Sequence, residues 1–295
     1  MASPPPPMSM GVTFGSAGLG GVLGWGVVHP FNTIAVRASL AAAHNRTFSL
    51  ASMLKKEGFL SVYDGLSAGL ARQVIYASSR FGLFEIFRDK LHVYRGKTDF
   101  PARVGVGAIS GGIAAYLSCP MEVCVVRMSN DKMLPITERR GYSSVFNAAS
   151  RIIKEEGAAA FWSGSTPFVQ RAMLVGVFQV ATYDQFKTLY VDLLGQKKNS
   201  VENVFCGAMT SGLLYSLVTM PLEVCKNRMA NQVANPTTGK KPYTGTLQAL
   251  QKIAKIEGVG GLYKGFLPYY GRCGGHTVSM FLFVTAIRNY INEVR

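Results

Sequence analysis

Long apolar stretches alternate with polar ones along the whole chain, and six of them contain about 20 residues or more. These stretches cover residues 11–35, 66–87, 104–126, 167–186, 204–225 and 266–287. A helix of that length crosses a hydrocarbon core about 30 Å thick. The pattern therefore predicts an all-α membrane protein with six transmembrane helices. Hydropathy alone favours the first, third and fifth stretches, because the other three contain arginines within the span.

The polar linkers between the two stretches of each pair end in segments with helical periodicity. Residues 142–156 and 243–257 are the clearest cases. In the first of these, Val145, Ala148, Ala149 and Ile152 recur at helical spacing with charged residues opposite. The pattern predicts short amphipathic helices, which lie either at the membrane interface or in a soluble linker. The linkers are also strongly basic. Because basic loops tend to remain on the side of the membrane from which they are not translocated, we expect the linkers to lie on that side.

Three copies of one motif show that the chain is repetitive. The pairs Glu57-Gly58, Glu156-Gly157 and Glu257-Gly258 lie 99 and 101 residues apart. Each pair is followed by an aromatic residue, then by a glycine, and then, seven residues later, by an arginine. This register predicts three tandem, pseudo-threefold units, 1–98, 99–198 and 199–295, that together form one domain.

Composition narrows the class of protein. Only 16% of the residues are charged, against about 25% in soluble domains, and the net charge is +15. The basic residues are scattered and form no run longer than two, which argues against a nucleic-acid partner and leaves an anionic membrane surface or an anionic substrate. The pairs Gly20/Gly24 and Gly107/Gly111 have the spacing of closely packed membrane helices.

Cysteine and histidine usage gives no sign of a metal site or a disulfide framework. The 5 cysteines lie in apolar runs without a Cys-x-x-Cys pair, and the 4 histidines are scattered. Residues 1–10 contain four prolines and no basic region, so we expect neither a secretory signal nor an Arg-rich transit peptide. Any import into an organelle would then use internal information.

A proline lies near the end of each odd-numbered apolar run, at Pro30, Pro120 and Pro221. Proline kinks a helix and would bring the residues that follow it in three neighbouring helices to one level. At that level Glu122 could meet Lys226. Charges at membrane depth are costly unless paired, so this pair could act as a latch that opens and closes. The alternative is static anchoring of the helix ends.

The even-numbered runs end in a second set of charges. Glu85 with Arg88, and Asp184 with Lys187, are acid–base pairs three residues apart, and Arg288 follows Thr285 at the same spacing. Within one helix such residues pair with small benefit. Around a threefold ring they would instead link neighbouring helices and close the opposite end of the molecule.

Arginines lie between these two charged levels. Arg72, Arg171 and Arg272 recur at the repeat spacing. Residues four and eight positions later share their helix faces, and these faces carry Tyr76, Arg80, Val175, Gln179, His276 and Met280. Unpaired guanidinium groups at depth are costly, so we expect them to face water, and guanidinium forks grip carboxylates. The pattern predicts a central site for a small dianion, in which Arg80 and Gln179 break the symmetry; the alternative is snorkelling to headgroups. Arginines that lay against lipid, or were locked to internal carboxylates without water, would contradict this site.

These motifs resemble those of the mitochondrial carrier family. The third unit matches that family's pattern throughout, at Pro221, Glu223, Lys226, Arg228, Glu257, Gly258, Tyr263, Lys264 and Gly265. The resemblance implies a six-helix bundle with three short matrix-side helices, in the mitochondrial inner membrane, that works by alternating access. It also places substrate contacts at Arg72 and Gln73, at Arg171 and Ala172, and at Arg272.

Within that family, residues 65–73, 139–148 and 265–278 are similar to those of carriers that exchange 2-oxoglutarate for malate. The resemblance implies a dicarboxylate antiporter and adds Arg80 to the substrate contacts. Together with the residues on the shared helix faces, the expected substrate contacts are Arg72, Gln73, Tyr76, Arg80, Arg171, Ala172, Gln179, Arg272 and His276. It implies a matrix gate of Asn32, Glu122, Glu223 and Lys226, and a cytoplasmic gate of Glu85, Arg88, Asp184, Lys187 and Arg288.

The chain departs from the family pattern at the gates. Asn32 replaces an acid, and Ala35 and Val125 replace bases, so Glu223 is expected to lack a partner and the matrix latch to be weak. On the cytoplasmic side Thr285 replaces an acid, which leaves the possible pairs Glu85–Lys187 and Asp184–Arg288.

We expect no cofactor and no metal, a monomer, and contact with lipid, including cardiolipin on the matrix side. Three alternatives remain: a carrier of phosphate, sulfate or citrate, a proton leak, and a degenerate carrier that serves as a membrane scaffold or receptor. An enzyme is disfavoured, because no nucleophile, base and orienting group cluster in the sequence and no phosphate loop occurs.

Overall fold

The computed structural model describes residues 10–43, 47–95, 100–195, 197, 200–233 and 240–294. These residues form nine α-helices and no strand. The six long helices are α1 (Met10–Ala43), α3 (Leu66–Arg95), α4 (Phe100–Asn130), α6 (Ser165–Leu194), α7 (Val201–Asn231) and α9 (Phe266–Val294). The three short ones are α2 (Leu50–Glu57), α5 (Val145–Glu156) and α8 (Thr246–Glu257). Each long helix corresponds to one of the six predicted apolar stretches.

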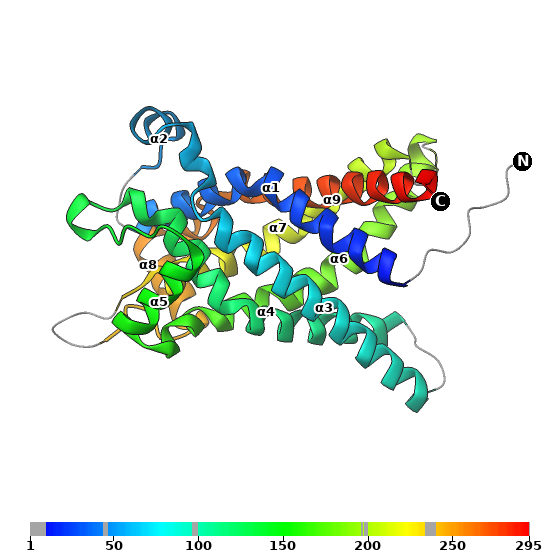
Figure 1. Cartoon of the computed structure of the whole chain (residues 1–295), viewed down its shortest axis with the longest axis horizontal. Coiled ribbons are helices and arrows are strands. Elements are labelled where there is room, and N and C mark those ends of the chain that lie inside the picture. Colours follow the sequence, from blue (N-terminus) through cyan, green and yellow to red (C-terminus); the bar gives the residue numbers. More distant parts are fainter. Residues whose placement is uncertain are drawn as a thin grey trace, which may run out of the picture.

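The long helices form a closed ring. Each one contacts the next in the order α1, α3, α4, α6, α7 and α9, and α9 lies against α1. Figure 1 shows α2, α5 and α8 together at one end of the bundle, which we call the linker end. The start of α1 and the end of α9 lie at the other end, which we call the terminal end. This arrangement agrees with an even number of spans.

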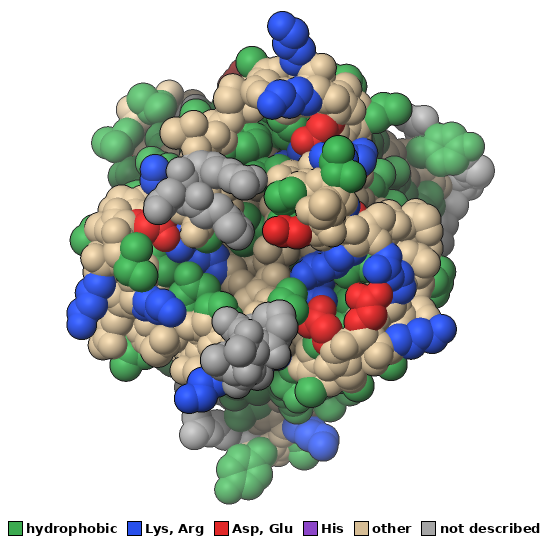
Figure 2. All heavy atoms as spheres, turned by 90° about the vertical axis from the view of Figure 1, so that its left-hand side faces the viewer, with side chains coloured by type: hydrophobic (Ala, Val, Ile, Leu, Met, Phe, Trp, Pro, Cys, Tyr) green, Lys and Arg blue, Asp and Glu red, His purple; other side chains and the backbone are tan. Residues whose placement is uncertain are grey.

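The odd-numbered spans carry the stronger membrane signal, as the sequence predicts. Among the described residues, three helical segments are long and apolar enough to cross a membrane: Gly18–Ala43, Val104–Met133 and Val201–Asn231. Basic side chains are spread around the linker end, with acidic ones between them (Figure 2).

The helices extend beyond the apolar runs that predicted them. Pro30, Pro120 and Pro221 lie inside α1, α4 and α7, which continue past them. The boundary of α5 differs in the other direction, because the helix begins at Val145 and not at residue 142. Ser144 caps this helix by accepting a hydrogen bond from the backbone of Asn147.

Glycines allow the helices to pack closely. Gly20 and Gly24 lie against Val284 and Met280 of α9, as the small-residue spacing predicts. Gly65, Gly164 and Gly265 precede or begin the even-numbered spans with positive φ angles of 83°, 87° and 84°. Each lies against the backbone of the first long helix of another unit, which is α4, α7 and α1 respectively. A side chain at any of these positions would therefore be strained and crowded.

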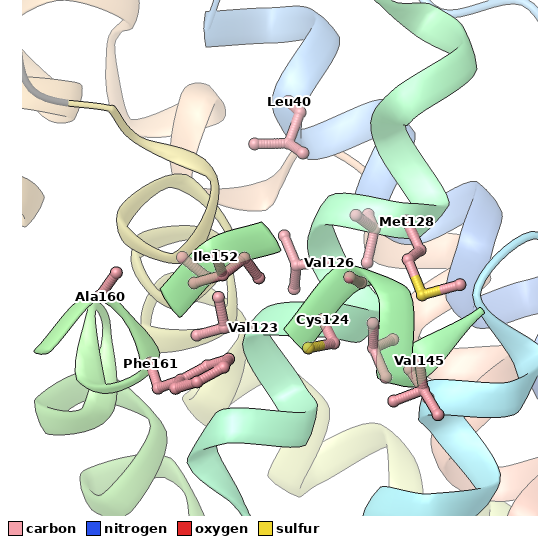
Figure 3. Packing of buried hydrophobic residues seen from close by; sticks show 14 residues of the cluster. Leu40, Val123, Cys124, Val126, Met128, Val145, Ile152, Ala160 and Phe161 are labelled. Carbon is pink, nitrogen blue, oxygen red and sulfur yellow. The ribbon is translucent and has the colours of Figure 1, made fainter. Parts of the chain in front are cut away.

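The apolar face of α5 packs onto the bundle. Val145, Ala148 and Ile152 are buried in one cluster with Val123 and Val126 of α4 (Figure 3). The sequence predicted that this helix lies either at the membrane interface or in a soluble linker. Neither prediction included the observed contact, in which the apolar face of the helix packs against α4. Burial of this stripe fixes the linker to the end of the span before it.

Three buried arginines tie each linker to its own unit. Arg37 binds Glu57 and Asp64 at 2.7 and 2.8 Å. Arg127 pairs with Glu156 in the second unit, and Arg228 with Glu257 in the third, each through both terminal nitrogens. The glutamates of the repeated Glu-Gly pairs are therefore the partners of these arginines.

Candidate substrate-binding site

Charged side chains converge on the interior of the ring near the three prolines. Lys226 of α7 lies 2.5 Å from Glu122 of α4 and 2.8 Å from Glu223 of its own helix. All three side chains are buried. The structure thus brings together Glu122 and Lys226, the pair that the sequence indicated.

The three repeat-related arginines reach the same carboxylates from the second long helix of each unit, α3, α6 and α9. Arg72 Nε lies 3.3 Å from Glu122, and Arg171 Nε lies 2.9 Å from Glu223. Arg272 Nη2 lies 3.7 Å from Glu223. Five of the six long helices, α3, α4, α6, α7 and α9, therefore contribute six charged side chains to one network. We call this network the central cluster and define it as Arg72, Glu122, Arg171, Glu223, Lys226 and Arg272.

Two sequence predictions are corrected by this network. The arginines were expected to be unpaired and to face water, but in this structure they are ion-paired to internal carboxylates, and Arg72 and Arg272 are buried. Pairing of this kind was the outcome named as contrary to an open, water-facing site, so that part of the prediction is wrong for this conformation. Glu223 was expected to lack a partner, yet it has Lys226, Arg171 and Arg272 around it. The physical reason is the same for both. With Ala35 and Val125 in place of bases, arginine side chains supply the positive charge that the carboxylates need.

The central cluster has more positive than negative charge. Four cations, Arg72, Arg171, Arg272 and Lys226, meet two carboxylates, Glu122 and Glu223. Among the described residues no further acid lies within ion-pair distance of these cations, so two positive charges are left uncompensated. Buried charge without a partner is costly, so an anion that balanced this excess would stabilise the cluster.

Aromatic and polar side chains hold the arginines in place. Arg171 Nε donates to the hydroxyl of Tyr269 at 3.0 Å, and that hydroxyl is 2.8 Å from Thr219 Oγ1. Arg72 Nη2 donates to Gln73 Oε1 at 3.1 Å. The Arg72 guanidinium also lies 4.1 Å from the ring centre of Trp25. These contacts fix the direction in which each fork can present its hydrogens.

Sequence reasoning did not find Trp25, Tyr269 or Thr219 as site residues. Tyr269 is fully buried, and its only sequence signal is its place three residues before Arg272. Trp25 stands in an apolar run, where an aromatic residue is ordinarily read as part of the core. Neither position carries a charge that would mark it.

The remaining predicted contacts lie around the cluster or toward the terminal end. Tyr76 packs on the buried cluster that contains Ala172, and Arg80 lies 3.5 Å from the Tyr76 hydroxyl. Among the described residues no acid lies within ion-pair distance of Arg80. The His276 ring is 6.1 Å from Trp25. The side chains of Gln179 and Asp184 lie outside the described residues, and Asn32 is buried in α1.

Of the two pairs predicted for the terminal end, the structure bears only on Glu85–Lys187, because the side chain of Asp184, the predicted partner of Arg288, lies outside the described residues. No ion pair joins Glu85 to Lys187 among the described residues, and Arg88 binds Asp89 instead. Arg288 donates to Ser16 at 3.2 Å, and Lys187 lies over the ring of Tyr183. Glu85 lines a cavity of about 470 Å³ between α1 and α3. The ion pairs between units therefore concentrate in the central cluster, toward the linker end.

Comparison with known proteins supports the threefold organisation. The family described as "Mitochondrial carrier protein" matches residues 6–95, 96–193 and 196–295. The chain is 36% identical to the mitochondrial 2-oxoglutarate/malate carrier protein of Bos taurus over 276 residues, which are 90% of this chain and 87% of that protein. It is 36% identical to the protein of that name from Caenorhabditis elegans, over 91% of this chain and 88% of the relative. It is also 34% identical to mitochondrial uncoupling protein 4 of Arabidopsis thaliana, over 82% and 75%.

The closed ring of six long helices and these threefold matches define a membrane transport protein. The chain belongs to the mitochondrial carrier family. It is a multi-pass protein of the mitochondrial inner membrane, and members of its family are transporters and not enzymes.

Proposed function

We propose that this carrier exchanges small dicarboxylates across the inner membrane, 2-oxoglutarate for malate or a close relative, by alternating access. The observation that carries the proposal is the charge of the central cluster, where four cations, three of them buried, face two carboxylates. A dicarboxylate carries the two negative charges that this balance lacks. The names of the relatives from Bos taurus and Caenorhabditis elegans support the same substrate class.

The substrate's carboxylates would compete with Glu122 and Glu223 for the same arginines. A substrate carboxylate that takes Arg171 and Arg272 leaves Glu223 with Lys226 alone. One that takes Arg72 does the same for Glu122, which keeps its contact with Lys226. Bidentate guanidinium–carboxylate pairs provide both the geometry and the free energy for this replacement.

This competition would connect binding to opening. The network joins α4 to α7 through Glu122 and Lys226. It joins these two helices to α3, α6 and α9 through the arginines. When the substrate replaces the protein's own carboxylates, the ties between helices at the linker end weaken. We infer that the linker end faces the matrix and that the Glu122–Lys226 pair is its gate. Arg80, closer to the terminal end, would meet an arriving anion first.

Replacement of Arg171 tests the site. Arg171→Ala removes the fork that Tyr269 and Glu223 hold, so we expect counter-exchange of malate for 2-oxoglutarate in proteoliposomes to fall by about 100-fold or more. Arg171→Lys keeps the charge but loses the fork and should retain partial activity. The matched control is Lys255→Ala, which removes one positive charge from an exposed position on α8. Full exchange by the Arg171→Ala protein would contradict the site.

Proton leak is a second candidate, and the similarity to uncoupling protein 4 of Arabidopsis thaliana favours it. The two functions are separable in the same liposomes. Acid-induced fluorescence change of a trapped pH dye in the absence of dicarboxylate reports a leak, whereas labelled malate uptake that requires internal dicarboxylate reports exchange. Proton flux without exchange would replace the first proposal with the second.

A further inference from the structure

One tryptophan of α1 lies beside two of the three arginines. The guanidinium carbon of Arg72 is 4.1 Å from the ring centre of Trp25, and that of Arg272 is 6.0 Å away. Trp25 is 4% exposed. A cation within about 6 Å of an aromatic face is attracted by the ring, most strongly where both groups are out of water. The indole therefore contacts the central cluster directly.

The backbone of α3 makes room for this ring. A Cβ atom at residue 69 would collide with Trp25 Nε1, so only glycine fits opposite the indole. The rings of His29 and His276 lie edge-on to Trp25, with centroids 6.0 and 6.1 Å from it. The indole is thus held from α1, α3 and α9, and it has little freedom to turn away from the arginines.

Trp25 breaks the threefold symmetry of the site. It stands five residues before Pro30, and the same place in the other units is held by Ala115 and Ser216. The first unit also lacks the acid and the base of the motif, since it has Asn32 and Ala35. In this unit an aromatic face contacts two of the arginines, and it lies seven residues before Asn32, the position at which the second and third units present Glu122 and Glu223.

We propose that Trp25 is a positioning residue that sets the length of the dicarboxylate this carrier accepts. Its ring holds Arg72 and Arg272 at a fixed separation and occupies the part of the site next to α1, where the equivalent positions of the other two units have the small residues Ala115 and Ser216. Short dicarboxylates then span the arginines, whereas longer ones meet the indole. This inference rests on the proposed dicarboxylate exchange and names the determinant of its selectivity.

Exchange measured over acids of increasing length tests the proposal. Proteoliposomes loaded with malate would be given labelled malonate, malate, 2-oxoglutarate or 2-oxoadipate, with wild type, Trp25→Ala, Trp25→Leu and Trp25→Phe. We expect Trp25→Ala to raise the uptake of 2-oxoadipate relative to malate about tenfold and to raise the KM for malate. Trp25→Phe keeps an aromatic face and should stay close to wild type in both readouts.

Trp25→Leu separates filling of space from attraction to the ring. It keeps much of the bulk and loses the aromatic face, so it should raise the KM for malate about tenfold with little change in the length profile. Trp162→Ala is the matched control, because this second tryptophan lies beside Tyr116 outside the central cluster. It should leave both readouts unchanged.

The results distinguish failure of this inference from failure of the proposed function. If wild type exchanges dicarboxylates and Trp25→Ala shows the wild-type length profile, the inference is overturned while the function stands. If Trp25→Ala cannot be reconstituted, equal KM values for Trp25→Leu and Trp25→Phe overturn it in the same way. If wild type moves none of the four acids, the proposed function fails and the inference falls with it.

Discussion

Glu223 is the residue on which the central cluster depends most. It lies within ion-pair distance of Lys226 on its own helix and of Arg171 and Arg272 on two others. Its side chain is 2% exposed, so water contributes little to its neutralisation. Among the described residues, no other carboxylate lies within ion-pair distance of Arg171 or Arg272.

Replacement of this carboxylate by its amide should destabilise the empty protein. Glu223→Gln leaves cations buried without compensation, at a cost of about 3–5 kcal/mol. We expect a lower midpoint of thermal unfolding in detergent for the variant. Added malate should raise that midpoint by more in Glu223→Gln than in wild type, because the freed arginines would bind the ligand's carboxylates.

Glu138→Gln is the control for this measurement. It makes the same chemical change at an exposed position of the second linker, so its midpoint and its response to malate should match those of wild type. A Glu223→Gln protein as stable as wild type, with no larger response to malate, would show that the carboxylate does not compete with substrate.

At the scale of the helices, the seams between units are built on glycine. Gly164 has a positive φ of 87°, and a Cβ there would lie 3.0 Å from the Lys226 carbonyl oxygen of α7. Gly195 also has a positive φ, of 62°, but nothing lies within 4 Å of its missing Cβ. The two positions share the backbone cost of a side chain and differ in the contact.

Alanine at these two glycines should therefore have unequal effects. Gly195→Ala should cost about 1 kcal/mol from its left-handed backbone. Gly164→Ala should cost that amount and roughly 1–3 kcal/mol more, because the added methyl group pushes α6 away from α7. Unfolding midpoints of the two variants in the same detergent make the comparison. Equal midpoints would mean that the seam yields without strain.

The gate at the linker end can be tested by restoring the missing charges of the first unit. The sequence predicted a weak matrix gate because Glu223 was expected to have no partner. The structure does not support that reason, because Glu223 contacts Lys226, Arg171 and Arg272. Asn32→Asp with Ala35→Lys would give α1 its own acid and base. A lysine at residue 35 would share Glu223 and add a tie between α1 and α7.

We expect this double variant to populate the state closed at the linker end more fully. The readout is labelling, by a membrane-impermeant maleimide, of a cysteine introduced for Ser39. Asn227 donates to the Ser39 hydroxyl at 3.2 Å across the α1–α7 contact. Labelling from the linker-end side should slow in the double variant. Asn32→Asp alone, which adds an acid without its base, is the comparison, and equal labelling rates would reject the gate assignment.

The helices were largely predictable from the sequence, and their ends were not. The six apolar stretches locate the spans because membrane crossing requires a minimum apolar length. That requirement does not determine where a helix ends outside the bilayer, where its turns can be polar. The continuation of α1 to Ala43 was therefore not predicted. The start of α5 at Val145 depends on the Ser144 cap, a local contact that periodicity does not register.

Contacts across the bundle were harder to predict than its elements. The repeat placed Arg72, Arg171 and Arg272 at one level, and the structure has them around one interior cluster. Sequence spacing gives a residue's height along a helix but not how far its side chain reaches across the ring. The ion pair of Arg171 with Glu223, and the place of Trp25 beside Arg72, depend on that reach.

For the whole molecule, the charge of the central cluster predicts strict exchange. Loaded with a dianion, the cluster is neutral; empty, it retains two uncompensated positive charges. Movement of each such charge through the membrane potential changes the free energy by about 2.3 kcal/mol per 100 mV. The loaded carrier should therefore reorient readily and the empty one slowly.

Uptake by liposomes with and without internal dicarboxylate measures this difference. We expect labelled 2-oxoglutarate to enter malate-loaded liposomes quickly, and at a rate that an imposed potassium diffusion potential does not change. Liposomes without internal dicarboxylate should take up little. Comparable uptake by both would show that the unoccupied carrier returns freely, against the charge argument.

The arginines that bind the Glu-Gly motifs determine where the molecule can come apart. Arg37 holds Glu57 and Asp64 of its own unit, but it also donates to the backbone of Ser129 in the next unit at 2.7 Å. Arg127 likewise holds Glu156 and reaches the backbone of Ala230 at 3.0 Å. Separation of two units breaks a single neutral acceptor contact at each of these arginines and spares the charged ones. The two long helices of each unit would then move together with their linker as one rigid body.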